Sequence, residues 1–187
     1  SNYKNAKSNG LKVGFYHYVT ARNVTQAKEQ ANFFARVISG KEIDCKLAMD
    51  FENFGNLYVS QINEISKVFL ETLESVTKTS PIIYSNAYSA REIFSSSLNK
   101  YPLWVANYGV SKPGSNGKWS SWVGWQYTST GRVNGIADNV DRNKFTDGVF
   151  LNNSTPIPPP PENSGNSNSD NTIVYSIKRG DTLSEIA

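Results

Sequence analysis

The regular alternation of two kinds of segment restricts the fold of this chain more than any other feature. Helical patterns, with apolar side chains every three or four residues, cover residues 2–9, 25–39, 60–77 and 88–98. Short apolar and aromatic segments lie between and after them, at residues 13–19, 47–51, 82–85, 103–108 and 123–128, with another near Val140. Strands that alternate with helices indicate a parallel sheet with helical crossovers. We therefore expect an α/β fold, either an open doubly wound sheet or a barrel.

The composition argues against several classes of function. The net charge is only +3 and no run of Lys or Arg stands out, so we expect no nucleic-acid partner. No stretch of about 18 apolar residues occurs, and we expect no membrane insertion. The single histidine, His17, and the single cysteine, Cys45, leave no internal disulfide and argue against a zinc site. We expect both in the core, and no glycine-rich phosphate loop follows a predicted strand.

Residues 152–171 divide the sequence into three parts. They hold four consecutive prolines and then a run rich in Asn, Ser and Gly, a composition that favours an extended tether. We therefore expect a folded domain over residues 1–151, a linker over 152–171 and the start of a second module over 172–187. Both ends of the sequence have the pattern of interrupted helices, so we expect a segment of a longer protein.

Two acidic residues, Asp50 and Glu52, lie at the end of the strand-like segment LAMDFEN. Side chains two positions apart on a strand share one face and lie about 6.5–7 Å apart along it. The carboxyl ends of parallel strands form the active-site rim of β/α folds, where we expect both acids. Neighbouring carboxylates repel each other, so one tends to keep its proton, as cleavage of a glycosidic bond requires. A pair that only caps a helix or binds Lys or Arg is the open alternative.

Aromatic side chains gather at or near the ends of the predicted strands. They are Tyr16, Tyr18, Tyr84, Trp104, Tyr108, Trp125 and Tyr127. Aromatic faces stack on sugar rings and tyrosine hydroxyls bond sugar oxygens, but large aromatic side chains also fill cores, so both roles stay open. Asp138 and Asp141 lie near the last predicted strand, where an acid can face the same cleft or serve a turn.

Five motifs that occur in order resemble a known family. GLKVGFYHYV, LAMDFEN, PIIYSNAY, YPLWVANYG and WVGWQYTSTGRVNGIADNVDRNKF are together similar to glycoside hydrolase family 25, the Chalaropsis-type lysozymes (N-acetylmuramidases) of bacterial autolysins and phage endolysins. The resemblance covers about residues 1–150. The segment YSIKRGDTLSEIA resembles the opening of a LysM module, a small domain that recognises wall glycans containing N-acetylglucosamine.

The resemblance implies a modified (β/α) barrel that cleaves the β-1,4 bond between N-acetylmuramic acid and N-acetylglucosamine in peptidoglycan. By motif, Glu52 resembles the general acid, Asp50 its partner that orients or stabilises the substrate acetamido group, and Asp141 a cleft aspartate of the last strand. The positions that match the sugar groove are Tyr16, Tyr84, Trp104, Trp125 and Gln126. The resemblance implies retention through the N-acetyl oxygen of the substrate, with a direct carboxylate role as the alternative. It implies no metal and no organic cofactor.

The family pattern also opens with a strand that carries a further cleft aspartate, and this sequence lacks that strand. We count about six strands where a complete barrel has eight and about 200–250 residues. The expected fold is therefore a partial (β/α)8-like barrel that lacks its first strands, followed by a disordered linker and an incomplete LysM fragment. An unclosed barrel exposes two unpaired edges, so we expect the segment alone to be unstable or inactive.

Three functional hypotheses follow. The first is a lysozyme, a monomer that acts on bacterial peptidoglycan outside the cell or in the cell wall, after secretion or release by a phage. The second is a non-catalytic glycan-binding protein on a decayed barrel, which the missing aspartate favours and the intact acidic pair disfavours. The third is another glycosidase with an acidic pair, such as a chitinase.

Overall fold

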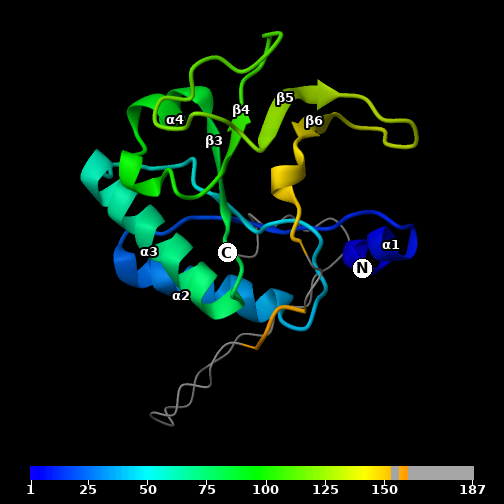
Figure 1. Ribbon diagram of the computed structural model, residues 1–187, viewed down its shortest axis with the longest axis horizontal. Helices are drawn as coiled ribbons and strands as arrows, with labels where there is room; N and C mark the ends of the chain where they lie inside the picture. Colours follow the sequence, from blue (N-terminus) through cyan, green and yellow to red (C-terminus); the bar gives the residue numbers. More distant parts are fainter. Residues whose placement is uncertain (153–155, 160–187) are drawn as a thin grey trace.

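A single curled sheet organises the chain, whose computed structural model describes residues 1–152 and 156–159 (Figure 1). Its six strands are adjacent in space in the order in which they occur in the sequence. They are β1 (Tyr16–Tyr18), β2 (Ala48–Asp50), β3 (Ile82–Asn86), β4 (Leu103–Ala106), β5 (Gly124–Gly131) and β6 (Val140–Phe145). The sheet forms half of a barrel, and within the described residues β1 and β6 do not pair with each other.

Helices connect the first four strands, as the alternation in the sequence predicts. The connecting helices are α2 (Val24–Ile38), α3 (Val59–Thr77) and α4 (Ala87–Glu92). A further helix, α1 (Asn2–Ser8), precedes β1, and short 3-10 turns lie at Ser96–Leu98 and Asp147–Val149. The bounds of α1, α2 and α3 agree with the predicted helices to within one residue. A side-chain hydrogen bond caps the start of each of these four helices. In α2, Asn23 accepts a hydrogen bond from the backbone N–H of Gln26 at 2.9 Å, and in α3, Gln61 accepts one from the N–H of Tyr58 at 2.9 Å.

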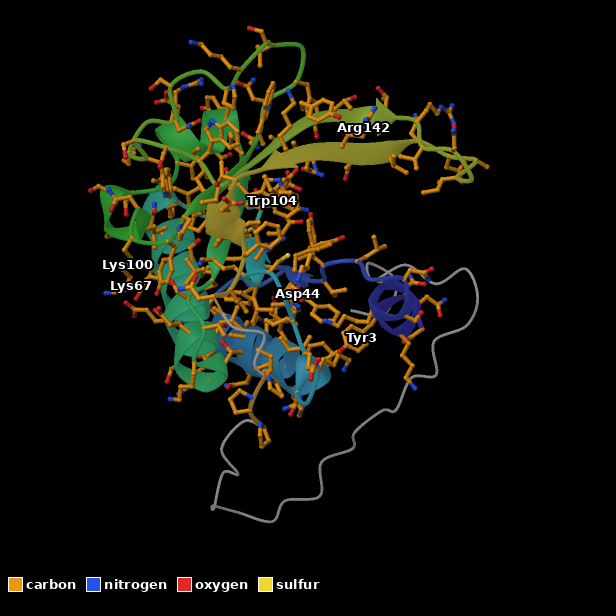
Figure 2. All side chains as sticks on the ribbon, turned by 45° about the vertical axis from the view of Figure 1, so that its right-hand side comes forward. Tyr3, Asp44, Lys67, Lys100, Trp104 and Arg142 are labelled. Atoms are coloured by element: carbon orange, nitrogen blue, oxygen red, sulfur yellow. The ribbon has the colours of Figure 1, made fainter. Side chains whose placement is uncertain are left out.

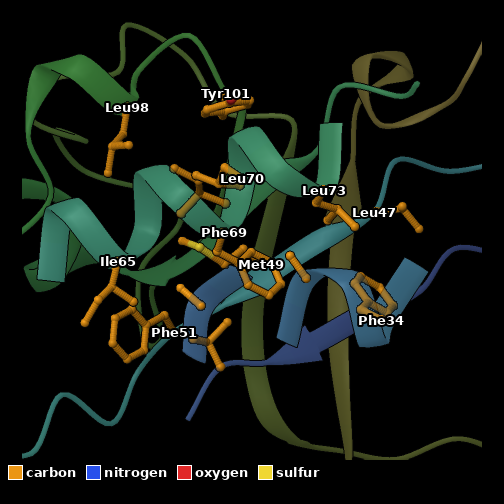
Figure 3. Close-up of a cluster of buried hydrophobic side chains, with 14 of the residues drawn as sticks. Phe34, Leu47, Met49, Phe51, Ile65, Phe69, Leu70, Leu73, Leu98 and Tyr101 are labelled. Atoms are coloured by element: carbon orange, nitrogen blue, oxygen red, sulfur yellow. The ribbon is translucent and has the colours of Figure 1, made fainter. Parts of the chain in front are cut away.

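The main core lies between the sheet and the packed pair α2 and α3 (Figure 3). His17, Met49, Ile83 and Leu103 are successive cross-strand partners in β1 to β4, so their side chains share this face of the sheet. The ring of His17 lies 5.5 Å from that of Phe34 and 5.6 Å from that of Phe69, measured between centroids. His17 is therefore a core residue that contacts Gln30 through its Nε2 atom, as expected from the sequence. Cys45 is half-buried.

Polar contacts tie α1 to the start of β1 and the segment before β2 (Figure 2). Asp44 accepts hydrogen bonds from the N–H of Val13 at 2.9 Å and from Lys7 Nζ at 3.1 Å, and it also pairs with Lys12 at 3.5 Å. The bond from Val13 lowers the pKa of the Asp44 carboxyl, although burial opposes it. The hydroxyl of Tyr3 binds the backbone of Glu42 on both its N–H and its C=O. Two side chains of α1, Tyr3 and Lys7, thus anchor this helix to the segment that precedes β2.

The last strand departs from the predicted parallel sheet, because β6 runs antiparallel to β5. The connection between them is the short loop 132–139, and a parallel pairing needs a crossover of a dozen or more residues. The loop lets the chain turn straight back, with register shifts between Gln126 and Gly131. As a result, the end of β6 lies beside the starts of the parallel strands.

The helix predicted over residues 88–98 is shorter in the structure. It ends at Glu92, and Phe94 turns into the core with no exposed surface. The side-chain amide of Asn63, on α3, donates to the C=O of Ile93 at 2.8 Å and accepts from the N–H of Ser95 at 2.6 Å. These contacts replace the backbone bonds that a longer helix would make.

Part of the predicted linker packs against the domain. Ile157 is buried in the core, and its C=O accepts a hydrogen bond from the N–H of Gly40 at 2.9 Å. The rest of the predicted linker and module, residues 153–155 and 160–187, lies outside the described residues. Among those that are described, no helix has both the length and the apolar character needed to cross a bilayer.

Candidate active site

The concave face of the sheet, opposite α2 and α3, brings most of the predicted site residues together. Tyr18, Asp50, Tyr84 and Trp104 form one cross-strand row from β1 to β4, and Gln126 lies on the same face of β5. We call this the inner face. It follows from strand alternation, because the residues between these positions point toward the helices instead.

Asp50 is the most enclosed acid of the inner face. Its side chain is the last of β2, the residue is 9% exposed, and one carboxyl oxygen, Oδ1, has no hydrogen-bond partner. Burial raises the pKa of Asp50 to about 8, and the neighbouring charge of Glu52 adds to the effect. Asp50 therefore holds a proton at neutral pH.

Glu52 follows β2 on an exposed part of the chain, two residues beyond Asp50. None of the ion pairs among the described residues involves Glu52, so the alternative in which this acid only pairs with Lys or Arg has no partner there. The sequence predicts that one acid of the pair keeps its proton, and the family resemblance assigns it to Glu52 as the general acid. In the structure, burial instead favours the protonated form of Asp50. Glu52 is the side chain that solvent and a ligand can reach.

A hydrogen-bonded pair of tyrosines meets at Gln126. The hydroxyl of Tyr84 donates to Gln126 Oε1 at 2.9 Å, and the hydroxyl of Tyr108 donates to the same oxygen. Burial, and then the charge of Glu52, raise the pKa of Tyr84 above its ordinary value, so its hydroxyl stays protonated. This network fixes three polar side chains close to the acidic pair.

Tyr16 and Asp141 lie at the open side of the inner face. Burial raises the pKa of the Tyr16 phenol, and the charges of Asp50 and Asp141 raise it further, so both aspartates are near enough to influence this hydroxyl. Asp141 is exposed near the start of β6, which the antiparallel direction brings toward the carboxyl ends of the parallel strands. Asp138 is exposed in the loop between β5 and β6.

Trp125 is not brought to the inner face. It lies between Gly124 and Gln126 in β5, and strand alternation turns it to the other side of the sheet. There it is 5% exposed, its indole N–H donates to the C=O of Asn107 at 2.8 Å, and Lys144 lies 5.2 Å above its ring. Its surroundings are those of a core residue.

One inner-face residue, Asn143, is not predicted from the sequence. Tyr18 and Tyr108 are predicted only among the aromatic side chains near strand ends and not among the positions that match the sugar groove. Asn143 accepts a hydrogen bond from the indole N–H of Trp104 at 2.9 Å. Trp104 is labelled in Figure 2. The signal for Tyr18 was present, because it is two residues from Tyr16 on one strand. Asn143 depends on the antiparallel register of β6, which has no counterpart in the local sequence pattern.

A cavity of about 360 Å³ opens at the other end of the inner face, among the starts of the parallel strands. Tyr16, Ala48, Ile82, Trp104 and Phe145 are among the residues that line it. Asp50 and Glu52 do not, because they lie at the carboxyl end of β2. Within the described part of the chain, no three His, Cys, Asp or Glu side chains are grouped so that they could hold a metal ion.

Comparisons with known proteins identify the relatives of this chain. Residues 1–136 match the sequence model described as glycosyl hydrolases family 25. The autolytic lysozyme of Clostridium acetobutylicum is 36% identical over 160 residues, which cover 84% of this chain and 46% of that protein. Lysozyme M1 of Streptomyces globisporus is 31% identical, over 78% of this chain and 53% of that protein. This chain spans about half the length of these curated relatives.

A solved structure extends the similarity to the fold. The bacterial lysozyme from Streptomyces coelicolor matches with a TM-score of 0.65 and 31% identity, over 77% of this chain and 71% of that chain. The match of the family model covers well over half of the sequence and includes both acids of the pair. The chain therefore belongs to glycosyl hydrolases family 25.

Proposed function

We propose that this chain is the catalytic part of a peptidoglycan hydrolase, a lysozyme that cleaves the β-1,4 bond between N-acetylmuramic acid and N-acetylglucosamine. One observation carries the proposal: a buried, proton-holding Asp50 lies beside an exposed Glu52 at the carboxyl end of β2. The relatives that are named lysozymes support the choice of polymer.

Glu52 is the proposed general acid, because its carboxyl can reach a glycosidic oxygen and that of Asp50 is enclosed. A sugar that covers Glu52 displaces water from it, which disfavours the ionised form and draws a proton to this acid. Glu52 then donates that proton to the departing oxygen as the bond from the anomeric carbon to this oxygen breaks.

Asp50 is the proposed partner that orients the acetamido group. When the sugar binds, Asp50 passes its proton to the neighbouring Glu52, which is the proton that Glu52 then donates. The Asp50 carboxylate accepts a hydrogen bond from the acetamido N–H, and the acetamido oxygen forms a bond to the anomeric carbon as the bond to the departing oxygen breaks. Water then opens this intermediate while Glu52 takes up a proton from it, so that the anomeric configuration is retained. The inner-face residues Tyr16, Tyr84, Trp104 and Gln126 are the proposed sugar contacts, and Asp141 is a further acid of the cleft.

The test is release of dye from labelled, purified bacterial walls. It uses the 187-residue chain and the protein as encoded in its gene, because the relatives are about twice as long as the matched part. Glu52→Gln should lower the rate by about 100-fold or more, which is typical for loss of a general acid. The matched control is Glu64→Gln, at an exposed position of α3, which should leave the rate unchanged. Undiminished dye release by Glu52→Gln would remove Glu52 from this role.

A non-catalytic glycan-binding protein is the second candidate. The observation that favours it is the cavity of about 360 Å³, which aromatic side chains line and the acidic pair does not. Binding to purified walls without any dye release would support this candidate. Chitin and peptidoglycan fragments offered side by side separate a lysozyme from a chitinase. We place the site of action at the cell wall, outside the membrane, and propose that the protein acts as a monomer, which sedimentation can test.

A further inference from the structure

We propose that Asn143 is a positioning residue, which holds the indole of Trp104 in place as a stacking platform for a sugar ring. The inference rests on the proposed function, because the platform serves a glycan. Asn143 lies on β6 and Trp104 on β4, two strands that do not pair with each other. The hydrogen bond from Trp104 Nε1 to Asn143 Oδ1, at 2.9 Å, spans the intervening strand β5.

Gly124 of β5 makes this contact across the sheet possible. It pairs with Trp104 on one side and with Phe145 on the other. A Cβ atom at position 124 would lie 2.6 Å from Trp104 Cδ1 and 2.6 Å from Phe145 Cε1. The missing side chain thus leaves the space into which both rings extend.

Two aromatic rings hold Trp104 from the sides. Tyr84 contacts it at 4.9 Å and Phe145 at 5.2 Å between ring centroids, both in edge-to-face geometry. The hydrogen bond to Asn143 fixes the remaining rotation of the ring. Trp104 nevertheless stays partly exposed and forms part of the wall of the cavity. A ring that is fixed before binding loses little entropy when a sugar stacks on it, so its restraint increases affinity.

The proposal predicts a specific dependence of glycan binding on Asn143. Binding of chitotetraose is measured by calorimetry in a Glu52→Gln background, so that turnover does not interfere. Asn143→Ala should weaken binding about tenfold, which corresponds to about 1.4 kcal/mol. Asn143→Asp keeps an acceptor oxygen at the same reach and should stay within about threefold of the parent. The matched control is Asn134→Ala, at an exposed position of the loop between β5 and β6.

A double-mutant cycle separates positioning from a purely structural role. Trp104→Phe removes the N–H donor, so in that background Asn143→Ala should change the dissociation constant less than twofold. In the intact lysozyme, Asn143→Ala should raise KM for walls while kcat stays within about twofold. If Asn143→Ala does not fold, Asn143→Ser, which shortens the reach of the acceptor, takes its place in the cycle.

Three outcomes would overturn the proposal. The first is that Asn143→Ala and Trp104→Phe weaken glycan binding independently, so that their effects multiply in the double variant. The second is that Asn143→Asp weakens binding as much as Asn143→Ala, and the third is that Asn143→Ala lowers the melting temperature but leaves the dissociation constant unchanged. Failure of the lysozyme assignment would appear separately. In that case walls would not be cleaved by the parent protein, whereas the binding cycle would still report on Asn143 and Trp104.

Discussion

Asp50 and Tyr84 are direct cross-strand partners in the parallel register of β2 and β3. Both are buried, and the pKa of each is raised, first by burial and then by the charge of Glu52. At neutral pH the inner face therefore presents two protonated groups beside one exposed carboxyl. Such a placement keeps the carboxyl pair from carrying two negative charges, so one proton is held beside Glu52, the acid that donates it in the proposed mechanism.

Asp50→Asn should stabilise the chain at alkaline pH. The pKa of Asp50 rises from 3.8 to about 8 on folding, so the folded state binds a proton that the unfolded state has released. The free energy of unfolding contributed by Asp50 therefore falls as pH rises from about 4 to about 8. A tenfold change in proton affinity is worth about 1.4 kcal/mol, so the gain at pH 8 should exceed that value.

The measurement for Asp50→Asn is the melting temperature between pH 4 and pH 9, in parallel with the unsubstituted chain. The two curves should lie close together at pH 4 and diverge toward pH 8. The wall-lysing activity of Asp50→Asn should fall over the whole pH range. Replacing a buried, destabilising residue of an active site commonly raises stability at the expense of activity. Parallel melting curves would contradict the raised pKa.

His17→Phe should weaken the loss of stability on the acid side. Burial between aromatic rings lowers the pKa of His17 from 6.5, and the hydrogen bond to Gln30 only partly opposes this. The unfolded chain thus binds a proton more readily than the folded chain, and stability falls as pH drops below about 6.5, by at most about 1.4 kcal/mol per pH unit. Denaturant unfolding between pH 7.5 and 5.5 should show a smaller decrease for His17→Phe than for the parent. An equal decrease would assign the acid sensitivity to other groups.

Local sequence patterns were sufficient to predict most of the fold. Residues 25–39 and 60–77 have a strong helical period because one side of each helix packs on the sheet. The segment LAMDFEN placed Asp50 correctly, since alternation separates it from the buried Met49 and Phe51. The direction of β6 was missed because it depends on the length of one connection, whereas the period of a strand is the same in either direction.

Strand geometry distinguishes two residues, Trp125 and Gln126, that the motif match assigned alike to the sugar groove. Trp125 and Gln126 are neighbours on one strand, so alternation allows only one of them to face the site. In the structure Gln126 lies on the inner face, where it accepts hydrogen bonds from two tyrosine hydroxyls. Asn143 was missed for a different reason, because its contact with Trp104 joins strands that are separated by a third.

Gly124→Ala should destabilise the chain by about 1–3 kcal/mol, as is usual when a side chain is forced into filled space. The added Cβ would lie 2.6 Å from atoms of both Trp104 and Phe145. The matched control is Gly114→Ala, because nothing lies within 4 Å of a Cβ at that position. In urea unfolding, the free energy of unfolding of Gly124→Ala should be about 1–3 kcal/mol lower than that of Gly114→Ala. Equal stabilities would mean that the two rings move apart at no cost.

Substitution of two tryptophans by phenylalanine should separate a core role from a site role. Trp125→Phe removes the indole N–H bond to Asn107 from a buried position, so it should lower the free energy of unfolding by about 1–3 kcal/mol. Below its melting temperature, this variant should release dye from walls at a rate within about twofold of the parent. Trp104→Phe keeps most of the ring contacts but loses the bond to Asn143, and its rate should fall about tenfold. Both quantities are measured on the same preparations, at 25 °C for dye release and by urea titration for stability. A large loss of activity in Trp125→Phe at full folding would place this residue back in the sugar groove.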